Sequence, residues 1–178
     1  MGYADADWAA DQSTRRSCSG WCITWLGACI VYGTAVQQCI ALSTTEAELI
    51  ALARATQEVM AVRKIMRDLE GPESIDQPTF IFCDNKSAVS LVKNNQYHKR
   101  TKHIDLRYFF IRDEEKKGTV RSARVPTKLN ISDGFTKVVD VNTIRDHRFR
   151  LHGMDLLHTT GGGDAKATHY RVPNPTAK

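Results

Sequence analysis

Four acidic residues that lie far apart in the sequence each stand at the end of an expected secondary-structure element. They are Asp5, Glu48, Asp84 and Asp133. Carboxylates held within a few ångströms of one another repel strongly, so a cluster of them persists when divalent cations neutralise it. Mg²⁺ prefers carboxylate oxygens, and two such ions can clamp the attacking and leaving oxygens of a phosphodiester. These residue types therefore suit metal-assisted phosphodiester hydrolysis, provided that the fold brings the four acids together.

Asp84 lies at the centre of the stretch around which the chain is organised. The apolar, β-prone run Thr79–Cys83 predicts a buried strand, and the residues after Asn85 repeat with helical spacing. Asp84 therefore ends a strand, at the position where α/β proteins commonly place their functional sites. The alternative is that Asp84 only caps the helix that follows.

The most clearly predicted helix spans Ser43–Glu70. Ser43 and Glu46 fit a capping box, in which the serine caps the helix and the glutamate reaches back. Glu48 stands four residues before Leu52, so it continues the apolar stripe toward the core. A buried carboxylate is unfavourable unless it is paired or bound to a cation. The alternative is that Glu48 stays solvated near the helix start, where an acid suits the helix dipole.

The first part of the chain predicts three strands. Gly2–Trp8 resembles the end of a strand with acids at its tip, and the pattern does not choose between Asp5 and Asp7. Ser19–Gln38 alternates between apolar and polar residues as a hairpin does, and Cys39–Leu42 is expected to extend its second strand. We expect these strands to pair in antiparallel fashion.

The second half of the chain predicts further helices and one more strand. His103–Lys117 has a helical pattern, Thr119–Val125 a strand pattern, and Asn130–Lys137 the composition of a helix start in which Asp133 could be a plain cap. Val138–Leu157 is weakly helical and basic. The inventory predicts a mixed α/β layered domain with an antiparallel hairpin on one side.

The composition is that of a globular protein with one folded domain. The chain has 178 residues, of which 42% are hydrophobic and 25% charged, with a net charge of +5. We expect a domain over residues 1–157 and a disordered tail over residues 158–178, which contain Gly161–Gly163 and little apolar content. The five cysteines show no zinc-site spacing, and no apolar run approaches membrane-spanning length. We therefore expect an intracellular protein that acts without a membrane.

A basic segment follows the central strand and its helix. Asn94–His103 carries Lys99, Arg100 and Lys102 together with the aromatic Tyr97. Basic side chains with an aromatic ring suit a phosphate backbone and its bases. The alternative is a solvated basic loop without a partner.

Six stretches of the sequence match one family, in the order in which that family has them, over roughly residues 2 to 155. They are Gly2-Tyr-Ala-Asp-Ala-Asp-Trp-Ala9, Arg15-Arg-Ser-Cys-Ser-Gly20, Ala41-Leu-Ser-Thr-Thr-Glu-Ala-Glu-Leu49, Cys83-Asp-Asn-Lys-Ser-Ala88, His98-Lys-Arg-Thr-Lys-His-Ile-Asp105 and Ser132-Asp-Gly-Phe-Thr-Lys137. With them the chain resembles the ribonuclease H domain of copia-type retrotransposon polyproteins, and more loosely the ribonuclease H family.

The resemblance implies a ribonuclease H-like α/β fold. Its five-stranded mixed sheet, with three antiparallel strands followed by two parallel ones, would be flanked by helices. It also implies hydrolysis of the RNA strand of an RNA–DNA hybrid with two Mg²⁺ ions, or Mn²⁺. The acidic tetrad of the family falls on Asp5, Glu48, Asp84 and Asp133, which chooses Asp5 over Asp7.

The resemblance also implies a role for each of these acids and for the basic segment. Asp5 and Asp84 would hold both metals, Glu48 would hold one and meet the RNA 2′-hydroxyl, and Asp133 would hold the other. Contacts to the hybrid are expected from five residues: Asn85, Lys99, Arg100, Lys102 and His103. The reverse transcriptase of the same polyprotein is an expected partner, in a cytoplasmic virus-like particle or in the nucleus.

The chain departs from the family pattern at two places. Cellular members often carry a histidine shortly before the last acid, and Val120–Ser132 contains none. An aliphatic residue usually follows the last acid, where this chain has Gly134. Gly134 favours a second possible function, a non-catalytic nucleic-acid-binding remnant of the domain. A third, weaker possibility is a different nuclease or integrase on the same fold.

Overall fold

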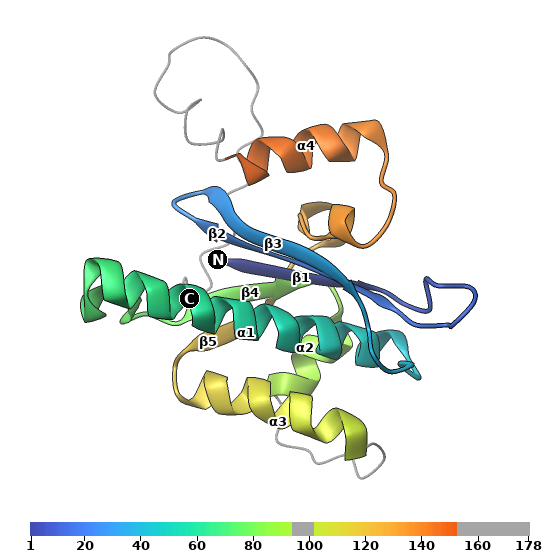
Figure 1. Cartoon of the computed structure of the whole chain (residues 1–178), viewed down its shortest axis with the longest axis horizontal. Helices are drawn as coiled ribbons and strands as arrows, with labels where there is room; N and C mark the ends of the chain where they lie inside the picture. Colours follow the sequence, from blue (N-terminus) through green and yellow to red (C-terminus); the bar gives the residue numbers. More distant parts are fainter. Residues whose placement is uncertain (94–101, 153–178) are drawn as a thin grey trace.

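A computed structural model describes residues 1–93 and 102–152 of the chain (Figure 1). Three strands come first, followed by the longest helix: β1 (Gly2–Asp7), β2 (Cys18–Trp25), β3 (Ala28–Val36) and α1 (Thr44–Glu70). The second half mixes helices and strands: β4 (Thr79–Cys83), α2 (Lys86–Lys93), α3 (Lys102–Lys116), β5 (Val120–Arg124) and α4 (Val141–Leu151). Short 3₁₀ turns lie at Pro72–Ile75, Thr127–Leu129 and Asp133–Phe135.

The five strands form one sheet in the order β3-β2-β1-β4-β5. β2 pairs in antiparallel fashion with both β1 and β3, whereas β4 runs parallel to both β1 and β5. The predicted sheet of three antiparallel strands followed by two parallel ones is therefore confirmed. Because β1 and β4 are parallel neighbours, their carboxyl ends reach the same end of the sheet.

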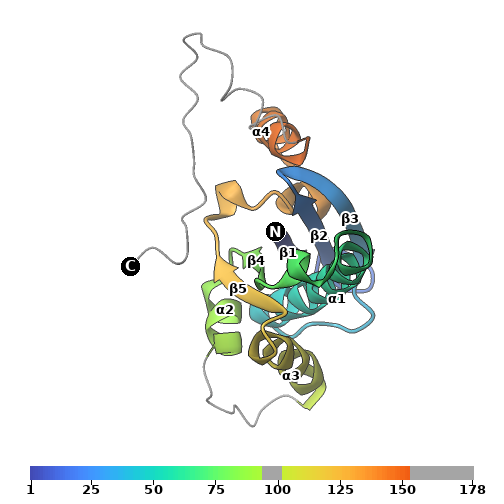
Figure 2. The same cartoon turned by 90° about the vertical axis from the view of Figure 1, so that its left-hand side faces the viewer.

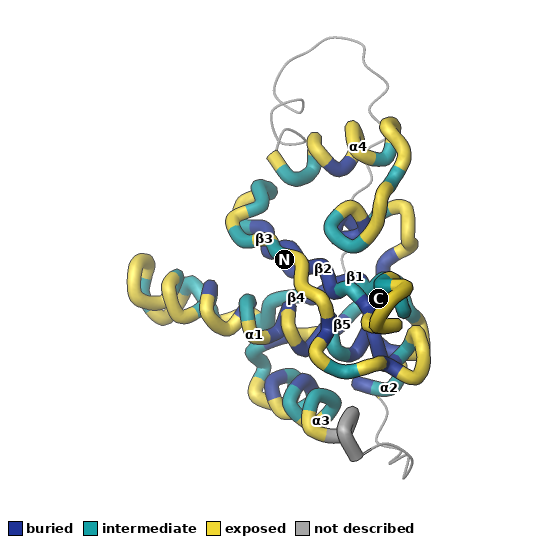
Figure 3. Tube along the Cα trace, turned by 45° about the vertical axis from the view of Figure 1, so that its right-hand side comes forward, coloured by how far each residue is buried: buried dark blue, intermediate teal, exposed yellow. Residues whose placement is uncertain are grey.

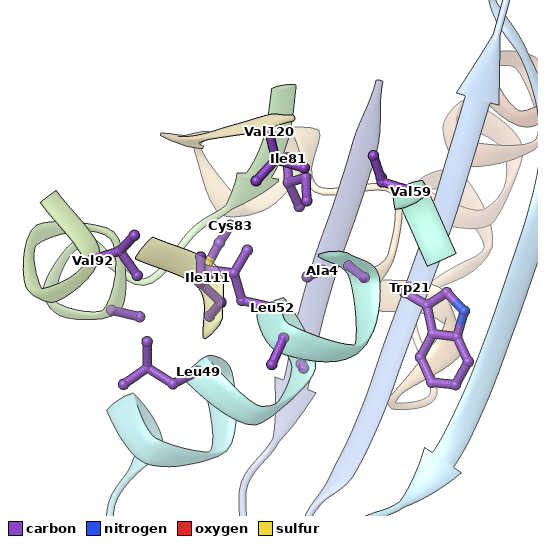
Figure 4. Close-up of a cluster of buried hydrophobic side chains, with 14 of the residues drawn as sticks. Ala4, Trp21, Leu49, Leu52, Val59, Ile81, Cys83, Val92, Ile111 and Val120 are labelled. Atoms are coloured by element: carbon purple, nitrogen blue, oxygen red, sulfur yellow. The ribbon is translucent and has the colours of Figure 1, made fainter. Parts of the chain in front are cut away.

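Helices cover both faces of the sheet (Figures 1 and 2). α1, α2 and α3 lie on one face, whereas α4 lies on the other side, where it contacts β3. The larger apolar core fills the space under α1, and Figure 4 shows Leu49 of α1 toward Val92 of α2 and Leu52 of α1 toward Ile111 of α3. A smaller apolar cluster on the opposite face contains Tyr3, Cys22, Phe82, Val125 and Ile131.

The local signals that predicted α1 are the ones that begin and end it. The N–H of Glu46 donates to Ser43 Oγ at 3.2 Å, and the N–H of Leu42 donates to Glu46 Oε2 at 2.7 Å. Gly71 ends the helix with a φ of 90°, a conformation that favours glycine. The first turns of α1 are buried, and its last turns are exposed to solvent (Figure 3). Glu46 is therefore explained by the cap, which leaves Glu48 free for another role.

The expected extension of the hairpin at Cys39–Leu42 is wrong. β3 ends at Val36, and the chain then turns inward. The buried Gln37 side chain fixes this turn, because its Nε2 donates to Ser19 Oγ at 2.8 Å and to the Ala47 carbonyl at 2.9 Å. A buried amide that bonds both β2 and α1 outweighs the weak strand preference of the residues after it.

The expected helix start at Asn130–Lys137 is also wrong, because only a 3₁₀ turn forms there, at Asp133–Phe135. The next regular helix, α4, begins at Val141, and Asp140 caps it by accepting the N–H groups of Asn142 and Thr143. Side-chain bonds from the turn to β1 compete with regular helix formation, and Gly134 lowers the helix preference further.

The proposed division into a domain over residues 1–157 and a tail over residues 158–178 stays a prediction, because the tail lies outside the described residues. Within the described residues, no helix is both long and apolar enough to span a membrane.

Candidate active site

Asp5 and Asp84 reach the same end of the sheet because β1 and β4 are parallel neighbours. Tyr3 of β1 pairs with Phe82 of β4, and each acid stands two residues further along its own chain segment. Asp5 is buried with 3% of its surface exposed, whereas Asp84 lies just after β4 and is partly exposed. The two carboxyls therefore lie beside each other at the carboxyl end of the central strands.

The carboxyl group of Asp5 is held by a hydrogen bond from a distant part of the chain. Thr136 Oγ1 donates to Asp5 Oδ2. Burial raises the pKa of Asp5 from 3.8 to about 6, and the nearby carboxyls of Asp133 and Asp84 add to the rise. Asp5 therefore lies close enough to both acids to interact with them electrostatically.

Glu48 enters the same cluster from α1. It is 6% exposed, so the alternative of a solvated Glu48 is wrong. Burial raises its pKa from 4.5 to about 9, with further contributions from Asp5 and Asp84, while the backbone N–H of Ala6 donates to it. In the absence of a cation, Glu48 therefore keeps its proton at neutral pH.

Cys83, which sequence reasoning did not single out, lies directly beside Glu48. Its Sγ donates to Glu48 Oε2 at 3.6 Å, and one ligand atom each from Glu48, Cys83 and Asp84 lie within 4.8 Å of one another. Burial raises the pKa of Cys83 well above 9, so the group stays a protonated thiol. Cys83 therefore orients the Glu48 carboxyl and is unsuited to bind a metal as a thiolate.

Asp133 is brought to the cluster by the residues just before it. The buried Asn130 Nδ2 donates to the Ala4 carbonyl of β1 at 3.0 Å, and its Oδ1 accepts from Ser132 Oγ at 2.6 Å. These bonds fix the turn so that Asp133 lies near Asp5, the residue that follows Ala4 in β1. Asp133 itself is 7% exposed.

Gly20 allows this turn to approach the sheet. It pairs with Asp5 in the register between β1 and β2. A Cβ at this position would lie 2.7 Å from Thr136 Cγ2 and 3.0 Å from Phe135 Cβ. Gly20 therefore has a physical role within Arg15–Gly20, one of the six stretches that match the family.

Thr136 and Lys137 are two further residues that sequence reasoning did not single out. Thr136 binds Asp5, as described above, and Lys137 Nζ lies 2.5 Å from Asp133 Oδ1. Burial tends to lower the pKa of Lys137, but the bond to Asp133 and the carboxyls of Asp5 and Asp84 outweigh it and raise the pKa. The signals for them in the sequence were their position within four residues of an expected catalytic acid and their place in the family-matching stretch Ser132–Lys137.

Gly134, the second departure from the family pattern, faces a buried histidine. A Cβ at Gly134 would lie 3.6 Å from His147 Nδ1, so glycine leaves room for the imidazole ring of α4. His147 is 4% exposed, and burial together with Arg150 lowers its pKa. A Cβ at position 134 would also lie 3.8 Å from Val139 Cγ2, so both contacts would be ordinary van der Waals contacts.

The predicted nucleic-acid contacts are only partly covered by the described residues. Asn85 caps α2, since its Oδ1 accepts the N–H of Ala88 at 3.0 Å. The alternative that Asp84 caps this helix is therefore wrong. Lys99 and Arg100 lie outside the described residues, as do the side chains of Lys102 and His103 in the first turn of α3.

The donor set fits a hard divalent cation. Oxygen ligands from Glu48 and Asp84 lie within a few ångströms of each other. The raised pKa values of Glu48 and Asp5 show buried carboxyls that lack sufficient positive charge nearby. A carboxylate-only site with a protonated thiol beside it suits Mg²⁺ or Mn²⁺ better than a thiolate-binding metal.

Searches of known proteins find relatives among plant transposons, although no protein-family model matches the sequence. The chain is 39% identical over 142 residues to a retrovirus-related Pol polyprotein from transposon TNT 1-94 of Nicotiana tabacum. It is 35% identical over 136 residues to the corresponding polyprotein from transposon RE2 of Arabidopsis thaliana. These matches cover 79% and 76% of this chain but only 10% and 9% of the polyproteins.

The fold is that of solved ribonucleases H1. LC11-RNase H1 in complex with an RNA/DNA hybrid superposes with a TM-score of 0.55 at 16% identity, covering 75% of this chain and 91% of that one. RNase H1 from Halobacterium salinarum NRC-1 superposes with a TM-score of 0.53 at 13% identity, covering 82% of this chain and 96% of that one. The chain is thus a domain with the ribonuclease H fold that belongs with the Pol polyproteins of copia-type retrotransposons.

Proposed function

We propose that this chain hydrolyses the RNA strand of RNA–DNA hybrids with Mg²⁺ or Mn²⁺. The observation that carries the proposal is the meeting of four carboxyls, from β1, α1, the end of β4 and the turn after β5, at one end of the sheet. Asp5 and Asp84 would hold two ions, with Glu48 on one and Asp133 on the other. Bound there, such ions activate water and stabilise the leaving oxygen of a phosphodiester.

The residues around the acids hold them in place for this chemistry. The Cys83 thiol and the Ala6 N–H orient Glu48, which is proposed to meet the RNA 2′-hydroxyl. Thr136 orients Asp5, and Asn130 ties the turn that carries Asp133 to β1. Because these supports come from packed or hydrogen-bonded groups, the carboxyls need little reorganisation when substrate binds.

An RNA–DNA hybrid is the proposed substrate. The LC11-RNase H1 neighbour was solved with an RNA/DNA hybrid, and the net charge of +5 suits a polyanion. Asn85, Lys99, Arg100, Lys102 and His103 are the proposed contacts to the two strands. The reverse transcriptase of the same polyprotein is the proposed partner, in a cytoplasmic virus-like particle or in the nucleus.

Cleavage of a labelled RNA–DNA hybrid in Mg²⁺ tests the proposal. We expect cutting by the wild type and a loss on the order of 100-fold or more in Asp84→Asn, because a metal-holding carboxylate is removed. Asp76→Asn is the matched control, since it removes an exposed carboxylate that no bond ties to the cluster.

Three outcomes would contradict this expectation in different ways. Hybrid binding without cleavage by the wild type would support a non-catalytic remnant. Cleavage of duplex DNA would support another nuclease on the same fold. Equal cutting by wild type and Asp84→Asn would place the chemistry elsewhere.

A further inference from the structure

Lys137 places a positive charge inside the acidic cluster. Its Nζ lies 2.5 Å from Asp133 Oδ1, and its charge also acts on Asp5 and Asp84. The Asp133 side chain is only 10% exposed, whereas that of Lys137 is 44% exposed. The lysine therefore reaches from the surface to a buried carboxyl group of the acidic cluster.

The contact joins residues four positions apart, and the N–H of Lys137 also donates to the Asp133 carbonyl at 3.3 Å, so the two residues span one turn of the chain. It differs from an ordinary surface ion pair because the carboxyl group of Asp133 is buried. Successive residues on an α-helix point in different directions, so neighbours seldom serve one site. Here, however, Thr136 Oγ1 donates to Asp5 and Lys137 Nζ contacts Asp133. Two consecutive side chains therefore serve two acids of one cluster.

We propose that Lys137 is the internal counter-cation of the acidic cluster, and that a divalent cation must displace it from Asp133. The ammonium and the cation compete for the same Oδ1 atom, since an oxygen that contacts an ammonium at this distance has no room for a metal in the same direction. Lys137 then stabilises the metal-free protein and weakens metal binding. The proposal rests on the proposed function, because it takes Asp133 as a metal-holding residue.

The competition predicts opposite effects of Lys137→Met on stability and on metal affinity. Without metal, the variant should melt at a lower temperature than the wild type, because Asp133 loses its charge partner. The affinity of the variant for Mn²⁺ should rise by about 1.4- to 5-fold, the range that the free energy of a partly exposed ion pair corresponds to. Calorimetric titration with Mn²⁺ in the absence of nucleic acid measures the affinity, and thermal unfolding in EDTA measures the stability.

Two further variants separate the position of the charge from its amount. Lys128→Met removes the same charge from an exposed residue of the preceding 3₁₀ turn, and should change neither quantity. Lys137→Arg keeps the charge at the cluster and should stay closer to the wild type than Lys137→Met does. Circular dichroism of each variant checks that the fold is intact.

The outcomes distinguish this inference from the proposed function. Mn²⁺ binding that depends on Asp84 but is unchanged or weaker in Lys137→Met would overturn the counter-cation role and leave the metal site in place. No Mn²⁺ binding by either the wild type or Lys137→Met would overturn both. Tighter binding by Lys137→Met, together with lower stability in EDTA, is the result that the inference predicts.

Discussion

Burial changes the protonation of two acids of the cluster, Glu48 and Asp5. Burial raises the pKa of Glu48 to about 9 and the pKa of Asp5 to about 6. Without cations the cluster therefore carries less negative charge at neutral pH than four ionised acids would. Because metal ligands must be deprotonated, cation binding should release protons and strengthen as the pH rises.

Burial, together with the nearby Asp5 and Asp84, raises the pKa of Glu48 from 4.5 to about 9 in the folded protein. The metal-free protein should therefore lose stability as the pH rises from about 4.5 to about 9. Between these values only the folded state holds the proton, so each pH unit costs about 1.4 kcal/mol of unfolding free energy. Below the window both states are protonated, and above it both are ionised, so the loss is then complete. Urea unfolding in EDTA across this window measures the slope.

Glu48→Gln is the matched variant for this pH prediction. The amide has nearly the same shape but cannot ionise, so the slope should flatten and the variant should exceed the wild type in stability at the alkaline end. An unchanged slope in Glu48→Gln would show that another group causes the pH dependence.

The structure also separates Asp5 from Asp7, which the sequence pattern left open. Asp5 receives the Thr136 hydrogen bond and interacts electrostatically with Asp133, whereas Asp7 is two residues further along β1 and only partly buried. We expect Asp5→Asn to reduce the rate of hybrid cleavage to roughly 1% of the wild-type rate or less. Asp7→Asn should retain the wild-type rate. Single-turnover cleavage by the two variants decides between them, and the reverse pattern would contradict the assignment of Asp5.

Local signals predicted the regular elements well, because each depends on neighbours in the sequence. The capping box at Ser43 and the apolar run of β4 are examples. The segment that carries Asp133 was not predictable in this way, since its shape depends on Asn130 and Thr136 bonding to β1. Cys83 was missed for the same reason, because only the packing of α1 on β4 brings Glu48 to its thiol.

Gly20→Ala should displace the turn at Asp133–Phe135 from the sheet. The added Cβ would lie 2.7 Å from Thr136 Cγ2, and overpacking of this kind typically costs about 1–3 kcal/mol. Because the displaced turn carries Asp133, we also expect weaker Mn²⁺ binding, measured by calorimetric titration.

Gly33→Ala is the control for that substitution. Its Cβ would lie 2.5 Å from Trp21 Cζ2, so it should also destabilise the fold, but it adds its methyl group on β3, against Trp21 and away from the turn. Equal loss of metal affinity in the two variants would show that Gly20 acts through general stability alone.

The charge of the whole domain should make hybrid binding sensitive to salt. With a net charge of +5 and the basic segment around Lys99 and Arg100, phosphate contacts should dominate the affinity. Affinity of the Asp84→Asn variant, which should not cut, is expected to fall on the order of 10-fold or more between about 50 and 200 mM salt. A flat response in fluorescence anisotropy would contradict a phosphate-dominated interface.

Replacing both Lys99 and Arg100 by alanine should reduce the affinity for the hybrid and the dependence of that affinity on salt concentration. Lys64 and Arg67 form the control pair, since they are exposed on α1 and their replacement removes the same charge elsewhere. An equal effect of both pairs would show that net charge matters and that the position of the basic segment does not.

The bond from Asn130 to Ala4 joins residues 126 positions apart, and the bond from Thr136 to Asp5 spans 131. A ribosome makes β1 early and the turn that completes the cluster only near the end of the domain. A nascent chain therefore lacks the assembled carboxyls until residues up to Lys137 have left the exit tunnel. The proposed nuclease would be inactive until this turn has been synthesised. A transcript truncated before the turn would encode a sheet with an incomplete acidic cluster.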